Sequence, residues 1–257
     1  VWMGGSSTNG GSTTWNGLTV GDGFAVSGRS LTSLSARGGV TIDWLAGVLL
    51  DEATISTGGG QVSIAGRRNS ATTSYGAGFI NYSGNAGTTI DAGAGTISIR
   101  GETADGTSTD VGMMTGLHPT SYTGKFTLKS SNSTAANAIT LTGISTSSSG
   151  DYGILVENTT RIVSTGSPVL LTGGSSATGI GIAIGAPAGN IGNLEVLSPS
   201  GTLLLDAGSG SLTVNAVSSL RAGAIAGDAS VATSSANIIL RASSIGLNGS
   251  GSLNTSG

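Results

Sequence analysis

Short alternating stretches of aliphatic and polar residues recur along the chain. Each places a small or polar residue between two apolar ones and is bounded by Gly, Asn, Asp or Ser; they cover residues 62–64, 97–99, 126–128, 139–141, 182–184, 194–196, 212–214 and 245–247. A period of two is typical of β-strands with one buried and one exposed face. Gly, Ser and Thr interrupt almost every window of helical periodicity. The pattern therefore predicts an all-β protein of many brief strands.

The spacing of these stretches predicts how the strands are arranged. In the last third they begin at Leu203, Leu212 and Leu220, too close together for helices or long hairpins between them. A strand of three to five residues buries little surface alone, so it must stack on an equivalent strand of the next coil. We therefore predict a parallel β-helix, or β-solenoid, of roughly 20–25 residues per coil and about ten to twelve coils.

One twelve-residue phrase occurs three times. TTIDAGAGTISI (88–99) and LLLDAGSGSLTV (203–214) share an Asp-Ala-Gly-x-Gly core, while ATISTGGGQVSI (53–64) has Ser56 at the position of the aspartate. Glycine permits the positive φ of a tight turn, and an Asp carboxylate can accept a hydrogen bond from the following backbone. We expect Asp91 and Asp206 to be corner residues, and the unequal spacings of 35 and 115 residues to reflect corner loops of different lengths.

Composition narrows the class of protein. Charged residues make up only 9% of the 257 residues, the net charge is −3 and there is no cysteine. No basic run is interleaved with aromatic residues, which argues against nucleic-acid binding, and no run of about 18 apolar residues predicts a membrane-spanning helix. A membrane β-barrel is disfavoured because its strands need about 9–11 residues. The chain also begins and ends without a leader or a closing motif, so we expect a segment of a longer polypeptide.

The segment NIILRASSIGLNGSGSLNTSG (237–257) and the Asp-Ala-Gly-x-Gly corners resemble the repeats of filamentous-haemagglutinin-like bacterial exoproteins. These are the large adhesins of two-partner secretion and related autotransporter passengers. The resemblance is clearest over residues 88–257. It implies a right-handed parallel β-helix that is exported across the outer membrane and displays loops on a long rod, secreted or at the bacterial cell surface.

Aromatic residues are concentrated in the first third of the chain. Seven of the ten precede residue 85, namely Trp2, Trp15, Phe24, Trp44, Tyr75, Phe79 and Tyr82. We expect one β-helix segment over residues 1–257. Its first part (1–87) would hold less regular, aromatic-containing coils, and its second part (88–257) regular aliphatic coils.

The longest interruptions of the alternating pattern are the candidate contact sites, because loops on a rigid scaffold often carry function. The first spans residues 65–84 and combines cations with aromatic rings suited to stacking on sugars or contacting protein. Its candidate residues are Arg67, Arg68, Tyr75, Phe79 and Tyr82. The favoured interpretation of this segment is that its aromatic side chains simply pack on the wall of the solenoid.

The second interruption, residues 100–124, carries Glu102, Asp105, Asp110, the pair Met113-Met114 and His118. The spacing of its carboxylates and its histidine matches no metal-ligand template, so a solvated loop is the favoured interpretation. His118 is the only histidine, and no serine lies in a nucleophile motif. We therefore predict no catalytic residues, no metal and no cofactor.

Five Asn-x-Ser/Thr sequons are possible glycosylation sites. They begin at Asn81, Asn132, Asn158, Asn248 and Asn254. In a chain this rich in Ser and Thr, several such sequons arise by chance.

The sequence therefore favours a structural and adhesive role, as a shaft segment of a large secreted or cell-surface bacterial protein. Its partners would be neighbouring coils of the same chain and a host-surface glycan or protein. The alternative is a self-assembling extracellular filament or biofilm matrix protein, with coil ends stacking between chains. A polysaccharide lyase or glycosidase on the same fold is less favoured, because such enzymes need carboxylates and cations clustered along one groove.

Overall fold

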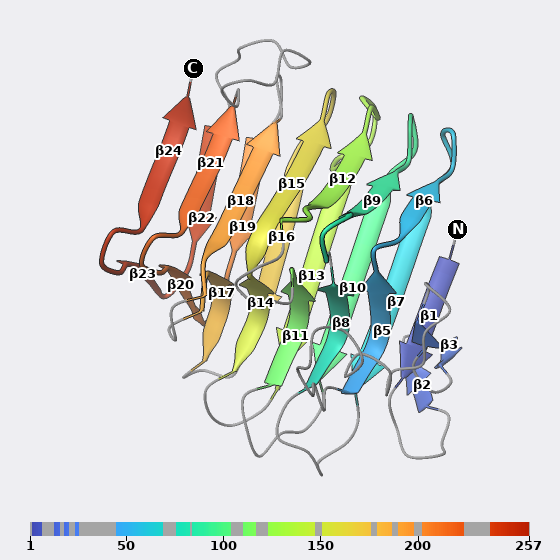
Figure 1. Ribbon diagram of the computed structural model, residues 1–257, viewed down its shortest axis with the longest axis horizontal. Coiled ribbons are helices and arrows are strands. Elements are labelled where there is room, and N and C mark those ends of the chain that lie inside the picture. Colours follow the sequence, from blue (N-terminus) through green and yellow to red (C-terminus); the bar gives the residue numbers. More distant parts are fainter. Residues whose placement is uncertain are drawn as a thin grey trace.

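The computed structural model describes residues 2–6, 13–15, 18–20, 24–25, 45–68, 76–82, 84–103, 110–116, 123–146, 151–175, 179–186, 190–197, 202–223 and 237–256. Within these ranges every regular element is a β-strand. Three parallel sheets run side by side along the stack, and the N- and C-terminal strands lie at its opposite ends (Figure 1).

Each of the three sheets is built from strands distant in the sequence. Sheet A orders β1 (Trp2–Ser6), β7 (Val62–Arg68), β10 (Ile97–Thr103), β13 (Ile139–Ser145), β16 (Val169–Gly174), β19 (Thr202–Asp206) and β22 (Asn237–Arg241). Sheet C orders β4 (Phe24–Ala25), β5 (Leu45–Asp51), β8 (Gly76–Tyr82), β11 (Asp110–Thr115), β14 (Tyr152–Val156), β17 (Ile180–Ile184), β20 (Ser211–Val214) and β23 (Ser244–Leu247). Sheet D orders β6 (Thr54–Ser56), β9 (Thr88–Asp91), β12 (Phe126–Ser130), β15 (Asn158–Ser164), β18 (Gly192–Leu197), β21 (Ser219–Gly223) and β24 (Ser252–Ser256). Sheet B is the antiparallel hairpin of β2 (Thr13–Trp15) and β3 (Leu18–Val20).

From β7 onward the chain visits sheets A, C and D in turn, which confirms the predicted parallel β-solenoid. The predicted coil length is wrong. One coil takes between 26 residues, from Asn193 to its partner Ser219, and 42 residues, from Ile97 to its partner Ile139. Each sheet accordingly holds seven or eight strands, not the ten to twelve levels that shorter coils would give.

Aliphatic side chains fill the interior in continuous columns. Strands such as β7 and β10 alternate buried and half-buried residues along their whole length. One column runs through Ile64, Ile99, Leu141, Leu171 and Leu205, each paired with the next and each no more than 1% exposed. Complete burial of such a side chain contributes about 1.5–3 kcal/mol. These columns hold successive coils in register.

Glycines mark the line along which sheets A and C touch. Gly66, Gly101, Gly143 and Gly173 form a column in sheet A. Sheet C carries a facing column of Gly47, Gly78, Gly112, Gly153 and Gly181. A Cβ atom on most of these glycines would overlap backbone atoms of the opposite sheet. Only residues without a side chain allow this approach of the two backbones.

A second apolar cluster lies on sheet C apart from the main core. Its buried members are Ala46, Leu49, Ala77, Ile80, Tyr82, Val111, Met114, Tyr152, Leu155 and Ala183. Every residue of β11 and of β14 is therefore buried. Strands of sheets A and D, such as β13 and β12, instead keep one face that is partly exposed to solvent.

The repeated phrase forms corners, as predicted. The Asp91 carboxylate accepts a hydrogen bond from the Gly93 amide (2.9 Å), and Asp206 accepts one from Gly208 (3.0 Å). Gly93 and Gly208 have φ values of 54° and 56°. Corner loops of different lengths explain only part of the unequal spacing between the three copies of the phrase. The copies at 53–64 and 88–99 turn from sheet D to sheet A one coil apart, whereas the copy at 203–214 turns from sheet A to sheet C.

The N-terminal end of the stack is irregular in its strand order. Strand β1 pairs with β7 in sheet A, and β4 then pairs with the outer edge of β5 in sheet C. Strands β5 to β8 already follow the regular order, so regular coils begin before residue 87.

Candidate interaction surfaces

The residues of the first predicted contact loop do not form one surface. Phe79 lies in the middle of β8 inside the main core, with its ring centroid 6.1 Å from that of Phe126. Tyr82 is 2% exposed and belongs to the second apolar cluster. Tyr75 lies outside the described residues. Phe79 and Tyr82 are therefore not contact residues, and both rings pack within the solenoid, as the packing interpretation of this segment expects.

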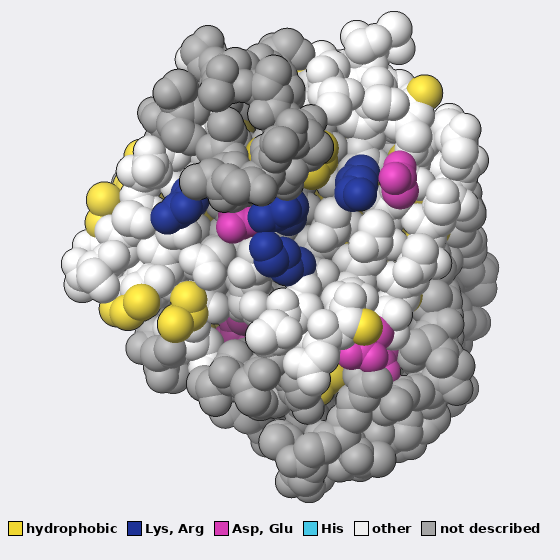
Figure 2. Space-filling view, turned by 45° about the horizontal axis from the view of Figure 1, so that its top comes forward, with side chains coloured by type: hydrophobic (Ala, Val, Ile, Leu, Met, Phe, Trp, Pro, Cys, Tyr) yellow, Lys and Arg dark blue, Asp and Glu magenta, His cyan; other side chains and the backbone are white. Residues whose placement is uncertain are grey.

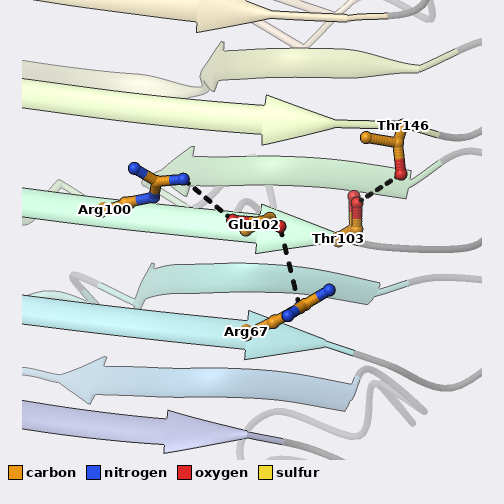
Figure 3. A network of polar contacts seen from close by, with 5 residues as sticks. All are labelled: Arg67, Arg100, Glu102, Thr103 and Thr146. Atoms are coloured by element: carbon orange, nitrogen blue, oxygen red, sulfur yellow. Dashed lines mark hydrogen bonds and ion pairs between the residues drawn. The ribbon is translucent and has the colours of Figure 1, made fainter. Parts of the chain in front are cut away.

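The two arginines of that segment have different surroundings. Arg67 points outward from sheet A, and its Nε lies 3.7 Å from Glu102 Oε1 on the next strand. Glu102 also accepts a hydrogen bond from Arg100 Nη2 at 3.0 Å (Figure 3). Arg68, the next residue, is 1% exposed and forms an ion pair with Asp110. Only Arg67 is therefore positioned to contact a partner.

The Arg68–Asp110 pair joins sheets A and C inside the molecule. Arg68 ends β7 and Asp110 begins β11, and both side chains are 1% exposed. Removing two charges from water costs several kcal/mol each, which the mutual attraction and hydrogen bonding offset. Thr103 and Ser145 continue the column of Arg68 at the ends of β10 and β13 and are also buried. These buried residues therefore stabilise the contact between sheets A and C, and a partner could not reach them.

The second predicted loop is divided between surface and interior. Asp105 and His118 lie outside the described residues. Met113 packs in the main core and Met114 in the second cluster, while Asp110 is buried in its ion pair. In the part of the chain that the structure describes, no three His, Cys, Asp or Glu residues group in a way that could hold a metal ion.

The outer face of sheet D carries a row of charged side chains. Arg161, Glu195 and Arg221 occupy adjacent register positions on β15, β18 and β21. The Arg161 Nε donates to Glu195 Oε2 at 2.9 Å. Figure 2 shows Lys and Arg side chains gathered on one face, with Asp and Glu side chains directly beside some of them. Arg161 is thus neutralised by Glu195, whereas Arg221 extends the row as an exposed cation.

Two lysines extend this basic face toward the N-terminal end of the stack. Lys125 precedes β12 and Lys129 lies within it, and both are exposed. Lys129 is the register partner of Asp91 on β9, whose carboxylate accepts the Gly93 amide. Among the described residues, no carboxylate forms an ion pair with Lys125, Lys129 or Arg221. We call Lys125, Lys129, Arg161 and Arg221 the sheet D basic face.

The sequon asparagines differ in accessibility. Asn81 is fully buried in β8, so an attached glycan would not fit there. The Nδ2 groups of Asn132, Asn158 and Asn248 donate to Ala94, Gly124 and Asn215, respectively. Asn254, on β24, is exposed, as is Asn248.

Asparagine side chains also link successive coils at the corner between sheets C and D. Asn248 Nδ2 donates to Asn215 Oδ1 at 2.9 Å, and Asn215 Nδ2 in turn donates to the Gly185 carbonyl at 2.5 Å. Glu157, one coil further back, accepts from Asn190 at 2.9 Å. Such ladders satisfy corner amides that the strands leave unpaired. The sequence search for catalytic groups did not detect them, although Asn at equivalent corner positions is a recognisable signal.

The pKa of one ionisable side chain, the Tyr152 phenol, is shifted from its ordinary value. Burial of the Tyr152 phenol, with a further contribution from the negative charge of Glu157, raises the pKa of Tyr152 above its ordinary value of 10.0. Tyr152 is therefore a neutral packing residue of the second cluster.

Comparison with protein-family models, with characterised proteins and with solved structures returns no match. Within the described residues there is also no helix long and apolar enough to cross a membrane. A function for this chain therefore has to be inferred from its fold and from the surfaces described above.

Proposed function

We propose that this chain is a structural segment, a stiff β-solenoid shaft of a large secreted or cell-surface bacterial protein. The observation that carries the proposal is the continuity of its columns. Aliphatic columns and the two glycine columns run through successive coils in one register, so each coil supports the next through backbone hydrogen bonds and side-chain packing.

Pulling along the stack tests the mechanical role. Cysteines introduced at Thr54 and Asn254, on the outer face of the first and last strands of sheet D, would attach single molecules to handles, since the chain has no cysteine of its own. We expect resistance to force followed by stepwise release, each step freeing one coil of 26–42 residues. Smooth extension at low force would contradict the role of a shaft.

The adhesive part of the proposal concerns the sheet D basic face. Its exposed cations Lys125, Lys129 and Arg221 suit an acidic group on a host-surface glycan or protein, an attraction that salt weakens. Purified chain would be tested on an array of acidic and neutral glycans beside a K125Q/K129Q/R221Q variant. R241Q is the control, because Arg241 is exposed on sheet A. Binding that is equal in all three proteins would contradict this assignment of the contact surface.

The resemblance of the corner phrases to filamentous-haemagglutinin-like repeats supports the same role. A glycan-degrading activity on this fold would instead release product from a polysaccharide panel. That assay separates the enzyme alternative from the shaft.

A further inference from the structure

Two aliphatic side chains are exposed side by side at the corner between sheets C and D. Outside β22, β23 and β24, the exposed large hydrophobic residues of the described chain are Ile191 (43%) and Val217 (64%). Ile191 precedes β18 and Val217 precedes β21, and these strands are neighbours in sheet D. The residues that follow them, Gly192 and Ser218, are joined by a hydrogen bond from the Gly192 amide to Ser218 Oγ (3.1 Å). We call Ile191 and Val217 the corner pair.

Coils on both sides already contact this corner. The Val217 amide donates to Ser250 Oγ of the next coil at 3.0 Å, and the Asn158 amide of the previous coil donates to the Ile191 carbonyl at 2.8 Å. Any further coil would stack beyond β24 and would not cover either side chain. The corner pair therefore belongs to the side of the solenoid and is exposed however many coils the shaft contains.

Val217 also holds an unfavourable backbone conformation. Its φ is 61°, in the left-handed region, where a β-branched residue is a steric outlier. Glycine and asparagine suit such positions, and Asn158 (φ 57°) and Gly185 (φ 78°) occupy positive-φ positions of this corner in earlier coils. Backbone strain of this kind occurs preferentially at functional sites. We therefore expect the aliphatic side chain of Val217 to make a contact.

Two exposed cations of the sheet D basic face flank the corner pair. Arg221 lies four residues after Val217 and points outward from β21, about 13 Å away at the rise of an extended strand. Lys125 precedes β12, two strands from β18 and thus roughly 10 Å across the sheet. Aliphatic and cationic side chains are therefore presented on the same side of the solenoid.

The carboxylates next to the corner pair are engaged within the protein. Glu195, on β18, accepts a hydrogen bond from Arg161 at 2.9 Å. Glu157, one coil before Ile191, is 5% exposed and accepts from Asn190 at 2.9 Å. Their charges are thus shielded from an approaching partner, whereas those of the two flanking cations are not.

We propose that the corner pair inserts into the surface of an anionic lipid bilayer, with Lys125 and Arg221 contacting the headgroups. Peripheral membrane affinity rises with the inserted apolar area and with attraction to anionic lipids, and a single weak anchor gives only marginal binding. The corner pair supplies one anchor and the cations supply the other. A protein partner fits less well, because protein interfaces bury about 800 Å² per partner around aromatic or arginine anchors.

This inference goes beyond the proposed glycan contact, which does not use Ile191 or Val217. The shaft would lie alongside a membrane, since the corner pair is on its side. The two contacts share Lys125 and Arg221, so only substitutions of the corner pair distinguish them. V217N should leave binding to acidic glycans unchanged.

Cosedimentation of the full chain with lipid vesicles tests the proposal. The wild type should bind vesicles of equal parts phosphatidylcholine and phosphatidylglycerol, should not bind phosphatidylcholine alone, and should be released by salt. V217N should weaken binding at least about tenfold because it removes the inserted side chain. R221Q should weaken it about fivefold. V217I keeps an aliphatic side chain on the same backbone and should bind at least as tightly as the wild type.

Stability and a fluorescent probe exclude an indirect effect. Asparagine suits the positive φ of residue 217, so V217N should unfold at no lower urea concentration than the wild type. The chain has no cysteine, so V217C carries one environment-sensitive fluorophore, whose emission should shift to the blue on anionic vesicles. The same fluorophore on S98C, on the outer face of sheet A, should not respond.

Three results would overturn the proposal. They are a wild type that binds no vesicles, equal binding to the two kinds of vesicle, and V217N and I191N variants that bind as tightly as the wild type. Loss of glycan binding in K125Q/K129Q/R221Q would not rescue it, because that result concerns the cations alone.

Discussion

Gly66 of sheet A lies directly against the carbonyl group of Gly78 in sheet C, with no space for a methyl group between the two strands. The same relationship recurs one coil later between Gly101 and Gly112, and again between Gly143 and Gly153. Glycine is required at these positions by contact between backbones, not by a turn. The two sheets are thereby fixed at a close distance along much of the stack.

Replacing one of these glycines should destabilise the fold. A Cβ atom at Gly173 would overlap the Gly181 carbonyl, whereas one at the next residue, Gly174, would make ordinary contacts of 3.6 Å with Ile144. We expect G173A to lower the free energy of unfolding by about 1–3 kcal/mol. The neighbouring G174A should change it by less than about 0.5 kcal/mol. Urea denaturation of both variants measures the difference, and equal midpoints would contradict the glycine contact.

The buried ion pair should be more important than the surface pairs. R68M leaves the Asp110 carboxylate without its cation and should cost about 3–5 kcal/mol of unfolding free energy. The double variant R68M/D110L removes both charges and should recover a large part of that loss. R100Q disrupts a partly exposed pair with Glu102 and should cost less than about 1 kcal/mol. Thermal unfolding of the complete double-mutant cycle tests this ranking, which would fail if R100Q were as damaging as R68M.

Tyr152 should make stability fall at alkaline pH. Because its pKa is raised above 10.0 in the folded protein, the folded state keeps the phenol proton where the unfolded state has lost it. This contribution is complete below pH 10 and is lost as the pH rises through the folded pKa. In Y152F the decline of unfolding free energy above pH 10 should be shallower than in the wild type. Parallel curves for the two proteins would show that Tyr152 is not the group responsible.

The asparagine ladder predicts unequal effects of two similar substitutions. Asn215 is 5% exposed and both donates to Gly185 and accepts from Asn248, so N215A should cost about 1–3 kcal/mol. Asn248 is exposed and its side chain donates to Asn215, so N248A should cost less than about 1 kcal/mol. Chemical denaturation compares them, and a larger effect for N248A would argue against the ladder.

The strands and corners were predictable from local pattern, because alternation and turn chemistry are encoded within a few residues. Asp91 and Asp206 are corner residues for the reason the sequence suggests. The coil length was not predictable in this way. The stretches beginning near Leu203, Leu212 and Leu220 belong to sheets A, C and D of one coil, and nothing in their spacing distinguishes three faces from three coils.

The candidate sites depended on long-range packing, which the sequence does not reveal. Phe79 and Arg68 look like loop residues because glycines surround them, but those glycines lie within strands where sheets A and C touch. A glycine flanked by aliphatic residues in successive strands is the signal that could have identified this contact. The sheet D basic face was also missed, since its members come from separate coils.

Disulfide formation between register partners tests the central claim, a three-sheet solenoid with coils of about 35 residues, most directly. Ser98 and Thr140 lie side by side on β10 and β13, whereas Leu170 lies one strand further along the same column. Neighbouring parallel strands bring paired Cα atoms to about 4.8 Å, within disulfide range. Oxidation of S98C/T140C should therefore give a rapid intramolecular bond, and S98C/L170C should not. No bond in the first variant, or a faster one in the second, would contradict the register on which the whole account depends.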